Sequence, residues 1–170
     1  MDDAPEFKLC HSASGVPYSR LELLAVFRSL RYNESFNAIS FRGINLEPLH
    51  SKFDSLGGDH IAWTTRSGIS ITKYFKITPQ DKSLLYQEVQ ALALKSHRLQ
   101  RLDFGYSLPT RRPKDTFDNE GGDLDKDPGT EIVGGLMPLC RGQLTNVDWV
   151  VLSGIELGET DFDDISKSHS

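Results

Sequence analysis

The stretch FRGINL at residues 41–46 recurs in outline as LSGIEL at residues 152–157. Both follow the pattern apolar-x-Gly-Ile-x-Leu, and each comes at the end of a segment whose apolar residues have extended spacing, namely Phe36, Ile39 and Phe41 or Val147, Val150 and Leu152. Such spacing predicts a β-strand, and the glycine marks the point where the strand ends. The two stretches therefore predict two strands that end in the same way.

The pattern becomes longer when the two stretches are extended backwards. Apolar residues with the spacing LxxLxLxxNxL occur twice, at Phe36, Ile39, Phe41, Ile44 and Leu46 and again at Val147, Val150, Leu152, Ile155 and Leu157. A third segment matches the first three positions, with Leu99, Leu102 and Phe104. Helical periodicity precedes each strand, over residues 19–32, 83–98 and 132–137. The sequence therefore predicts a helix followed by a strand, three times.

This spacing resembles that of the leucine-rich repeat superfamily. The arrangement is similar to ribonuclease-inhibitor-like repeats, including those of the actin scaffolds that regulate capping protein. The resemblance implies an α/β fold, namely a leucine-rich-repeat solenoid of about three to four irregular strand-helix units that stack on one another. A compact α+β domain with the same element order is the alternative.

The repeat spacing is irregular. The repeats begin at positions 36, 99 and 147, which are 63 and 48 residues apart, whereas the long helical class has roughly 28 residues per repeat. A long loop accounts for the excess in the second interval. In the first interval, a degenerate repeat at Ile61 to Thr65 is expected. The position that is usually Asn or Cys is occupied by Ile44, Ser107 and Ile155.

Length and composition indicate about one folded domain. The chain has 170 residues, of which 38% are hydrophobic and 25% charged, and these values are typical of globular proteins. We expect a flexible N-terminal segment at 1–18, the repeat-like domain at 19–165 with a mobile charged loop at 105–130, and a tail at 166–170. The net charge of −5 makes nucleic acid an unlikely partner.

Motifs for catalysis or cofactors are not found in the sequence. Cys10 and Cys140 lack the spacing of a zinc site, and the run Asp123, Asp125 and Asp127 imitates a calcium loop but continues with proline where glycine is needed. We therefore predict no catalytic residue, no metal, no cofactor and no enzymatic activity. No apolar run reaches 18 residues and no signal sequence is recognised, so we expect a cytoplasmic protein without a membrane span.

A repeat of this kind would bind its partner on the concave face of the sheet, where the residues between the apolar positions point outwards. The predicted protein-binding residues are Asn37, Ser40, Arg42, Gln100, Arg101, Asp103, Tyr106, Asp148, Trp149 and Ser153. Tyr, Trp and Arg dominate interface energies, which favours Tyr106, Trp149 and Arg101. The alternative is that Trp149 belongs to the core, because a shift of one residue exchanges the two faces of a strand.

The predicted function is that of an intracellular protein-binding scaffold, or a fragment of one. The resemblance to actin-regulating scaffolds implies partners in cytoskeletal or small-GTPase signalling. Units that leave apolar faces open at both ends also predict end-to-end self-association. A small α+β regulatory domain and an enzyme without a recognisable motif are the alternatives.

Overall fold

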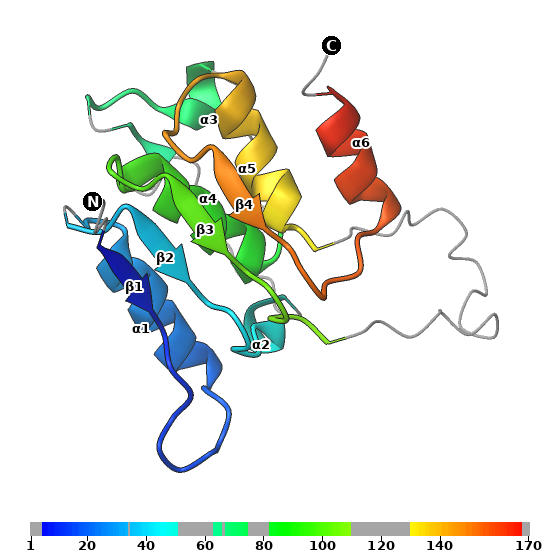
Figure 1. Cartoon of the computed structure of the whole chain (residues 1–170). Coiled ribbons are helices and arrows are strands. Elements are labelled where there is room, and N and C mark those ends of the chain that lie inside the picture. Colours follow the sequence, from blue (N-terminus) through cyan, green and yellow to red (C-terminus); the bar gives the residue numbers. More distant parts are fainter. Residues whose placement is uncertain are drawn as a thin grey trace.

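The computed structural model describes residues 5–33, 35–50, 63–65, 67–74, 82–109 and 130–167. Within these residues, four strands form one parallel sheet in the order in which they occur along the chain (Figure 1). The strands are β1 (Glu6–Lys8), β2 (Ala38–Ser40), β3 (Arg101–Asp103) and β4 (Trp149–Val151). The α/β class predicted from the sequence is therefore confirmed.

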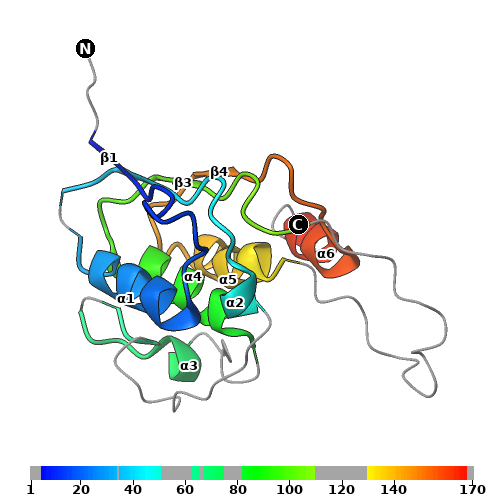
Figure 2. The same ribbon diagram turned by 90° about the horizontal axis from the view of Figure 1, so that it is seen from below.

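A helix follows each strand. The helices are α1 (Arg20–Leu30), α2 (Glu47–His50), α3 (Ile71–Tyr74), α4 (Leu84–Lys95), α5 (Ile132–Arg141) and α6 (Glu159–Lys167). Figure 2 shows α1, α4 and α5 side by side under one face of the sheet. No helix or strand of the described chain covers the opposite face, which we call the bare face.

The strand register agrees with the spacing of apolar residues in the sequence. Ile39, Leu102 and Val150 are neighbours across β2, β3 and β4, and Phe7 is the neighbour of Ile39 in β1. Ile39 and Leu102 are fully buried against the helices. Because side chains alternate between the faces of a strand, the residues on either side of these four point to the bare face.

Aromatic stacking connects the sheet to α1. The Phe27 ring of α1 stacks on Phe41 with centroids 4.4 Å apart, and Phe41 in turn lies 5.7 Å from Phe104. Helix α1 begins at a capping box, in which the Ser19 hydroxyl accepts from the Glu22 amide and the Glu22 carboxylate accepts from the Ser19 amide. The predicted helix at residues 19–32 is thus confirmed as α1.

Strand β1 was not anticipated, since residues 1–18 were expected to be a flexible segment. Phe7 is half-buried and packs against Phe36, with ring centroids 5.6 Å apart. The Asn37 amide donates to the Pro5 carbonyl and the Leu9 amide donates to the Ser40 carbonyl, at 3.1 and 3.0 Å. A strand of three residues has little signal of its own, and the neighbouring strand supplies its hydrogen bonds.

The predicted degenerate repeat at Ile61 to Thr65 does not add a strand to the sheet, because β2 pairs directly with β3. The described part of this region makes a tight turn with one antiparallel bridge between Thr64 and Ser70, and α3 follows at once. Residues 61 and 62 lie outside the described residues. Most of the charged loop expected at 105–130, including the calcium-like run of aspartates, also lies outside them.

The last two helices differ from the expectation. Helix α5 continues through Pro138 to Arg141, and Leu139 beyond the proline is fully buried. Helix α6 forms in an acidic segment where no helix was predicted. Its Asp161 is buried and accepts hydrogen bonds of 2.9 Å from the amides of Thr130 and Gly158.

Candidate functional site

The bare face of the sheet presents its side chains in rows that run across the four strands. One row consists of Glu6, Ala38, Arg101 and Trp149, and the next of Lys8, Ser40, Asp103 and Val151. The Trp149 residue is 61% exposed. The alternative that Trp149 belongs to the core is therefore wrong.

Arg101 lies at the centre of the first row. Its Nη1 donates to Glu6 Oε2 at 3.0 Å, and its Nη2 lies 3.8 Å from Asp103 Oδ2. Its guanidinium carbon lies 5.1 Å from the centroid of the Trp149 ring. Arg101 reaches Glu6 across β2 because the residue between them, Ala38, has only a methyl side chain.

Asp103 joins this group to a second arginine. Its carboxylate accepts from the Gly105 amide at 2.8 Å and from Arg42 Nη1 at 3.5 Å. The guanidinium carbon of Arg42 lies 4.9 Å from the centroid of the Tyr106 ring. The charged groups Glu6, Arg101, Asp103 and Arg42 thus form a continuous chain, with Trp149 at one arginine and Tyr106 at the other.

Three stacked turns follow β2, β3 and β4. The amides of Ile44, Ser107 and Ile155 each donate to the carbonyl three residues earlier, at 3.0, 3.1 and 3.2 Å. The third residue of each turn has a positive φ, and it is glycine in two turns and Tyr106, with φ 57°, in the other. A Cβ at Gly154 would lie 2.2 Å from the Tyr106 ring. Gly154 therefore provides the space in which Tyr106 lies.

We expect Gly154→Ala to lower the free energy of unfolding more than Gly15→Ala does. Both glycines have positive φ, but a Cβ at Gly15 would meet nothing within 4 Å. The Gly15 substitution should cost about 1–2 kcal/mol of backbone strain. The Gly154 substitution should also displace the Tyr106 ring from Arg42, which adds about 0.5–1 kcal/mol.

Urea denaturation measures both costs, and the background variant Tyr106→Ala isolates the ring contact. In that background the two glycine substitutions should cost the same. An equal cost already in the wild-type background would show that Tyr106 does not rest on Gly154.

The structure brings together five of the ten predicted site residues, namely Arg42, Arg101, Asp103, Tyr106 and Trp149. Ser40 is buried beside them and accepts from the Arg42 amide at 3.2 Å, and Ser153 is exposed in the turn after β4. The other three precede the strands and extend the backbone ladder, with the Gln100 amide donating to Asn37 and the Asp148 amide donating to Gln100.

Sequence reasoning missed Glu6, Lys8 and Val151, which share the bare face with the predicted residues. The first two belong to the segment EFKL, whose alternation of charged and apolar residues was the available signal. Val151 follows Val150 in a run of apolar residues, so no alternation in the sequence places Val151 on the bare face.

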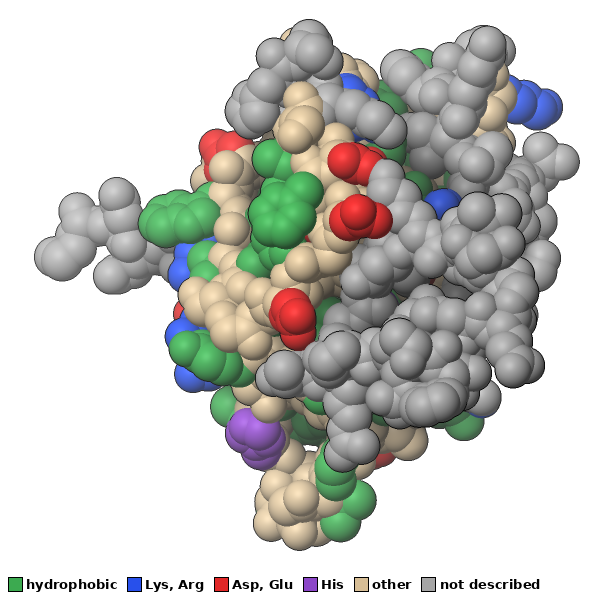
Figure 3. Space-filling view, turned by 90° about the vertical axis from the view of Figure 1, so that its right-hand side faces the viewer, with side chains coloured by type: hydrophobic (Ala, Val, Ile, Leu, Met, Phe, Trp, Pro, Cys, Tyr) green, Lys and Arg blue, Asp and Glu red, His purple; other side chains and the backbone are tan. Residues whose placement is uncertain are grey.

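The end of the sheet next to β4 is a second exposed surface. Figure 3, which looks onto this end, shows hydrophobic side chains beside acidic ones. Phe162 of α6 is 57% exposed, and Glu156 and Glu159 are exposed as well. This end is therefore both apolar and acidic.

Three comparisons with known proteins found no match for this chain. The sequence matches no protein-family model and no curated protein, and the structure matches no solved structure. Within the described part of the chain, no helix has the length and apolar character needed to cross a membrane. Among the same residues, His, Cys, Asp and Glu form no group that could hold a metal ion.

Proposed function

We propose that this chain is a protein-binding module built as a short leucine-rich-repeat-like solenoid, and that it binds its partner on the bare face of the sheet. The order of the strands supports the solenoid, since all four are parallel and each lies beside the next in the chain. The helices α1, α4 and α5 gather on the other face, as stacked strand-helix units require.

The observation that carries this proposal is the exposure of two aromatic residues on or beside the bare face. Trp149 is 61% exposed and Tyr106 58% exposed, and each lies against an arginine. Side chains that are already held in place lose less conformational entropy when a partner binds. Trp, Tyr and Arg are also the residue types most often found to dominate binding energy.

The charges on the bare face favour a protein over a polyanion. Glu6 and Asp103 neutralise the two arginines within the face itself. A surface that binds nucleic acid gains its affinity from cations that replace the counterions of phosphates. The bare face of this chain offers acids and bases in alternation, which suits the mixed polar surface of a protein.

The proposal predicts that Arg101→Glu and Trp149→Ala each weaken partner binding by about tenfold or more, the effect of losing a central interface residue. Two substitutions of the same chemistry outside the strands serve as matched controls, namely Arg98→Glu and Tyr32→Ala. Both control residues are exposed, and Tyr32 is 58% exposed.

Quantitative affinity capture from lysate of cells that express the chain measures the effect, once circular dichroism shows that all four variants are folded. We expect proteins retained by the wild type and both controls to be lost from both bare-face variants. Retention of the same proteins by all four variants would overturn the proposal.

A further inference from the structure

A pocket of about 290 Å³ lies on the helical side of the molecule, away from the bare face, where α4, α5 and α6 meet. Its lining includes Tyr86 of α4, Gly134 of α5 and Asp164 of α6, together with Lys82 and Glu131, which come just before α4 and α5. A single water needs only about 10–15 Å³ by the same measure, so the pocket has room for a small ligand.

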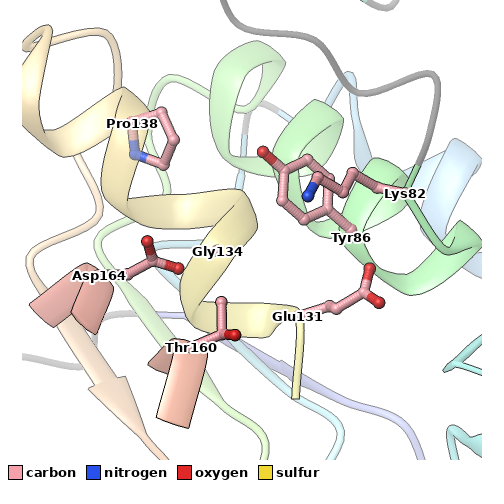
Figure 4. A pocket seen from close by; sticks show the side chains of 7 residues that line it. All are labelled: Lys82, Tyr86, Glu131, Gly134, Pro138, Thr160 and Asp164. Atoms are coloured by element: carbon pink, nitrogen blue, oxygen red, sulfur yellow. The ribbon is translucent and has the colours of Figure 1, made fainter. Parts of the chain in front are cut away.

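The pocket combines an aromatic face with two carboxylates. Figure 4 shows the Tyr86 ring on one side, Glu131 below it, and Asp164 on the far side of Gly134. Burial first of all, together with the negative charges of Asp164 and Glu131, raises the pKa of Tyr86 to about 12, against the opposing effects of the Gln90 hydrogen bond and of Arg141. Tyr86 is therefore neutral at physiological pH and lies in a field that its two acidic neighbours make more negative.

A cation of the chain itself already lies in this pocket. The Lys82 ammonium nitrogen lies 5.7 Å from the centroid of the Tyr86 ring. In Figure 4 the Lys82 side chain crosses the face of the ring. An ammonium group over an aromatic ring is attracted by the negative face of the ring, and nearby carboxylates add to that attraction.

At the helix N-termini that border the pocket, several backbone amides already donate to side chains of the chain itself. At α4, the Ser83 amide donates to Glu131 Oε2 at 2.9 Å and the Tyr86 amide donates to the Ser83 hydroxyl at 3.2 Å. At α5, the Ile132 amide donates to the Thr130 hydroxyl at 3.1 Å. Beside Lys82, the pocket presents the Tyr86 ring and the carboxylates of Glu131 and Asp164.

Gly134 keeps the space between the two walls open. A Cβ on this residue would lie 3.2 Å from the Tyr86 ring and 3.4 Å from Asp164 Oδ2. Any side chain here would narrow the gap between the aromatic ring and the carboxylate. A small ligand can therefore contact both groups at once.

We propose that this pocket is a binding site for a primary alkylammonium group, and that Lys82 competes with the ligand for the face of Tyr86. The alkyl chain would lie along the Tyr86 and Pro138 side chains, and the ammonium would lie between the ring and the carboxylates of Glu131 and Asp164. This site is independent of the protein-binding face proposed above.

Because Lys82 competes with the ligand, removing the positive charge of Lys82 from the pocket should make an alkylammonium ligand bind more tightly. This expectation gives the proposal a distinctive test. The probe is n-butylammonium chloride, and its neutral counterpart is 1-butanol. Titration of the ¹⁵N-labelled protein, followed by the amide signals of Glu131 and Gly134, gives the dissociation constant. In Lys82→Met, which keeps an apolar stem, n-butylammonium should bind about three- to thirtyfold more tightly, the range of a partly desolvated cation–π contact.

The variant Asp164→Asn and the neutral probe 1-butanol are the two controls. Asp164→Asn, with folding checked by circular dichroism, should weaken n-butylammonium binding in the Lys82→Met background and leave that of 1-butanol unchanged. A dissociation constant that Lys82→Met leaves unchanged, or equal binding of 1-butanol and n-butylammonium, would overturn the proposal.

A second probe, Nα-acetyl-lysine methylamide, separates the two sources of such a group. Binding of both cationic probes would support recognition of lysine side chains as well as free amines, whereas binding of n-butylammonium alone would support free amines. If neither cationic probe shifts the amide signals of Glu131 and Gly134, the ammonium site is contradicted.

Discussion

Glu88→Leu is expected to lower the free energy of unfolding by about 3–5 kcal/mol, the cost of removing one partner of a buried ion pair. Glu88 lies in α4 and is fully buried. Its carboxylate accepts from Arg31 Nη2 at 2.8 Å and from Arg28 Nε at 3.3 Å. The Arg31 side chain is only 6% exposed, so the substitution leaves its charge buried without a carboxylate.

The double variant Glu88→Leu with Arg31→Met is the control for this effect. Replacing a buried pair by apolar residues of similar volume is often neutral, so the double variant should recover most of the lost stability. Arg28→Met should cost less than about 1 kcal/mol, because that side chain is half-exposed. Urea denaturation measures all three. A double variant less stable than Glu88→Leu would contradict the importance of the stranded Arg31 charge.

Gly135→Ala is expected to destabilise the protein by about 1–3 kcal/mol, as inserting a group into a packed core does. A Cβ on Gly135 would lie 2.9 Å from the backbone carbonyl of Tyr86, and backbone cannot move aside as a flexible side chain can. Nearby, Gln90 Nε2 donates to the Gly135 carbonyl at 3.1 Å. The contact between α4 and α5 therefore depends on a residue without a side chain at this position.

Gly134→Ala is the matched control, since it makes the same change one position earlier in the same helix. Both substitutions gain about 1 kcal/mol of helix propensity. At Gly134 the nearest atom is a ring carbon of Tyr86 at 3.2 Å, which needs to move by only a few tenths of an ångström. Thermal and urea denaturation should show Gly134→Ala near wild type. Equal losses for both variants would contradict a helix contact specific to Gly135.

The strand register was predictable because the apolar residues of three segments follow the same short spacing pattern. Ile39, Leu102 and Val150 hold the same position in three segments of sequence, and the structure makes them neighbours across the sheet. The alternation around them also separates the bare face from the core. The exposure of Trp149 follows from that register.

The buried polar groups of α4 were not predictable from helical periodicity. Every residue from Leu84 to Lys95 is buried, including Gln87, Glu88 and Gln90. A pattern of apolar residues identifies the face of a helix toward the sheet, whereas the burial of Glu88 depends on Arg28 and Arg31, about 60 residues earlier. Contacts between distant segments of this kind leave no local signal.

The candidate site was predictable only in part, because the periodicity of the strands indicates some of its residues and not others. Arg101, Tyr106 and Trp149 lie in segments whose periodicity is clear, and the structure places them at the bare face or its edge. The chain of charges through Glu6 required β1, a strand of three residues that its neighbour stabilises. The alkylammonium pocket joins residues from three helices, including α6, which the sequence did not indicate.

Photo-cross-linking from the bare face tests the proposed function most directly, because it reports contact rather than a loss of affinity. A photoreactive phenylalanine analogue is placed at Val151 or Lys8 on the bare face, or at Ala25, an exposed residue of α1. After irradiation in cells, we expect the two bare-face positions to cross-link to the same protein and Ala25 to leave that protein unlabelled. A common product from Ala25 with none from Val151 and Lys8 would contradict binding through the bare face.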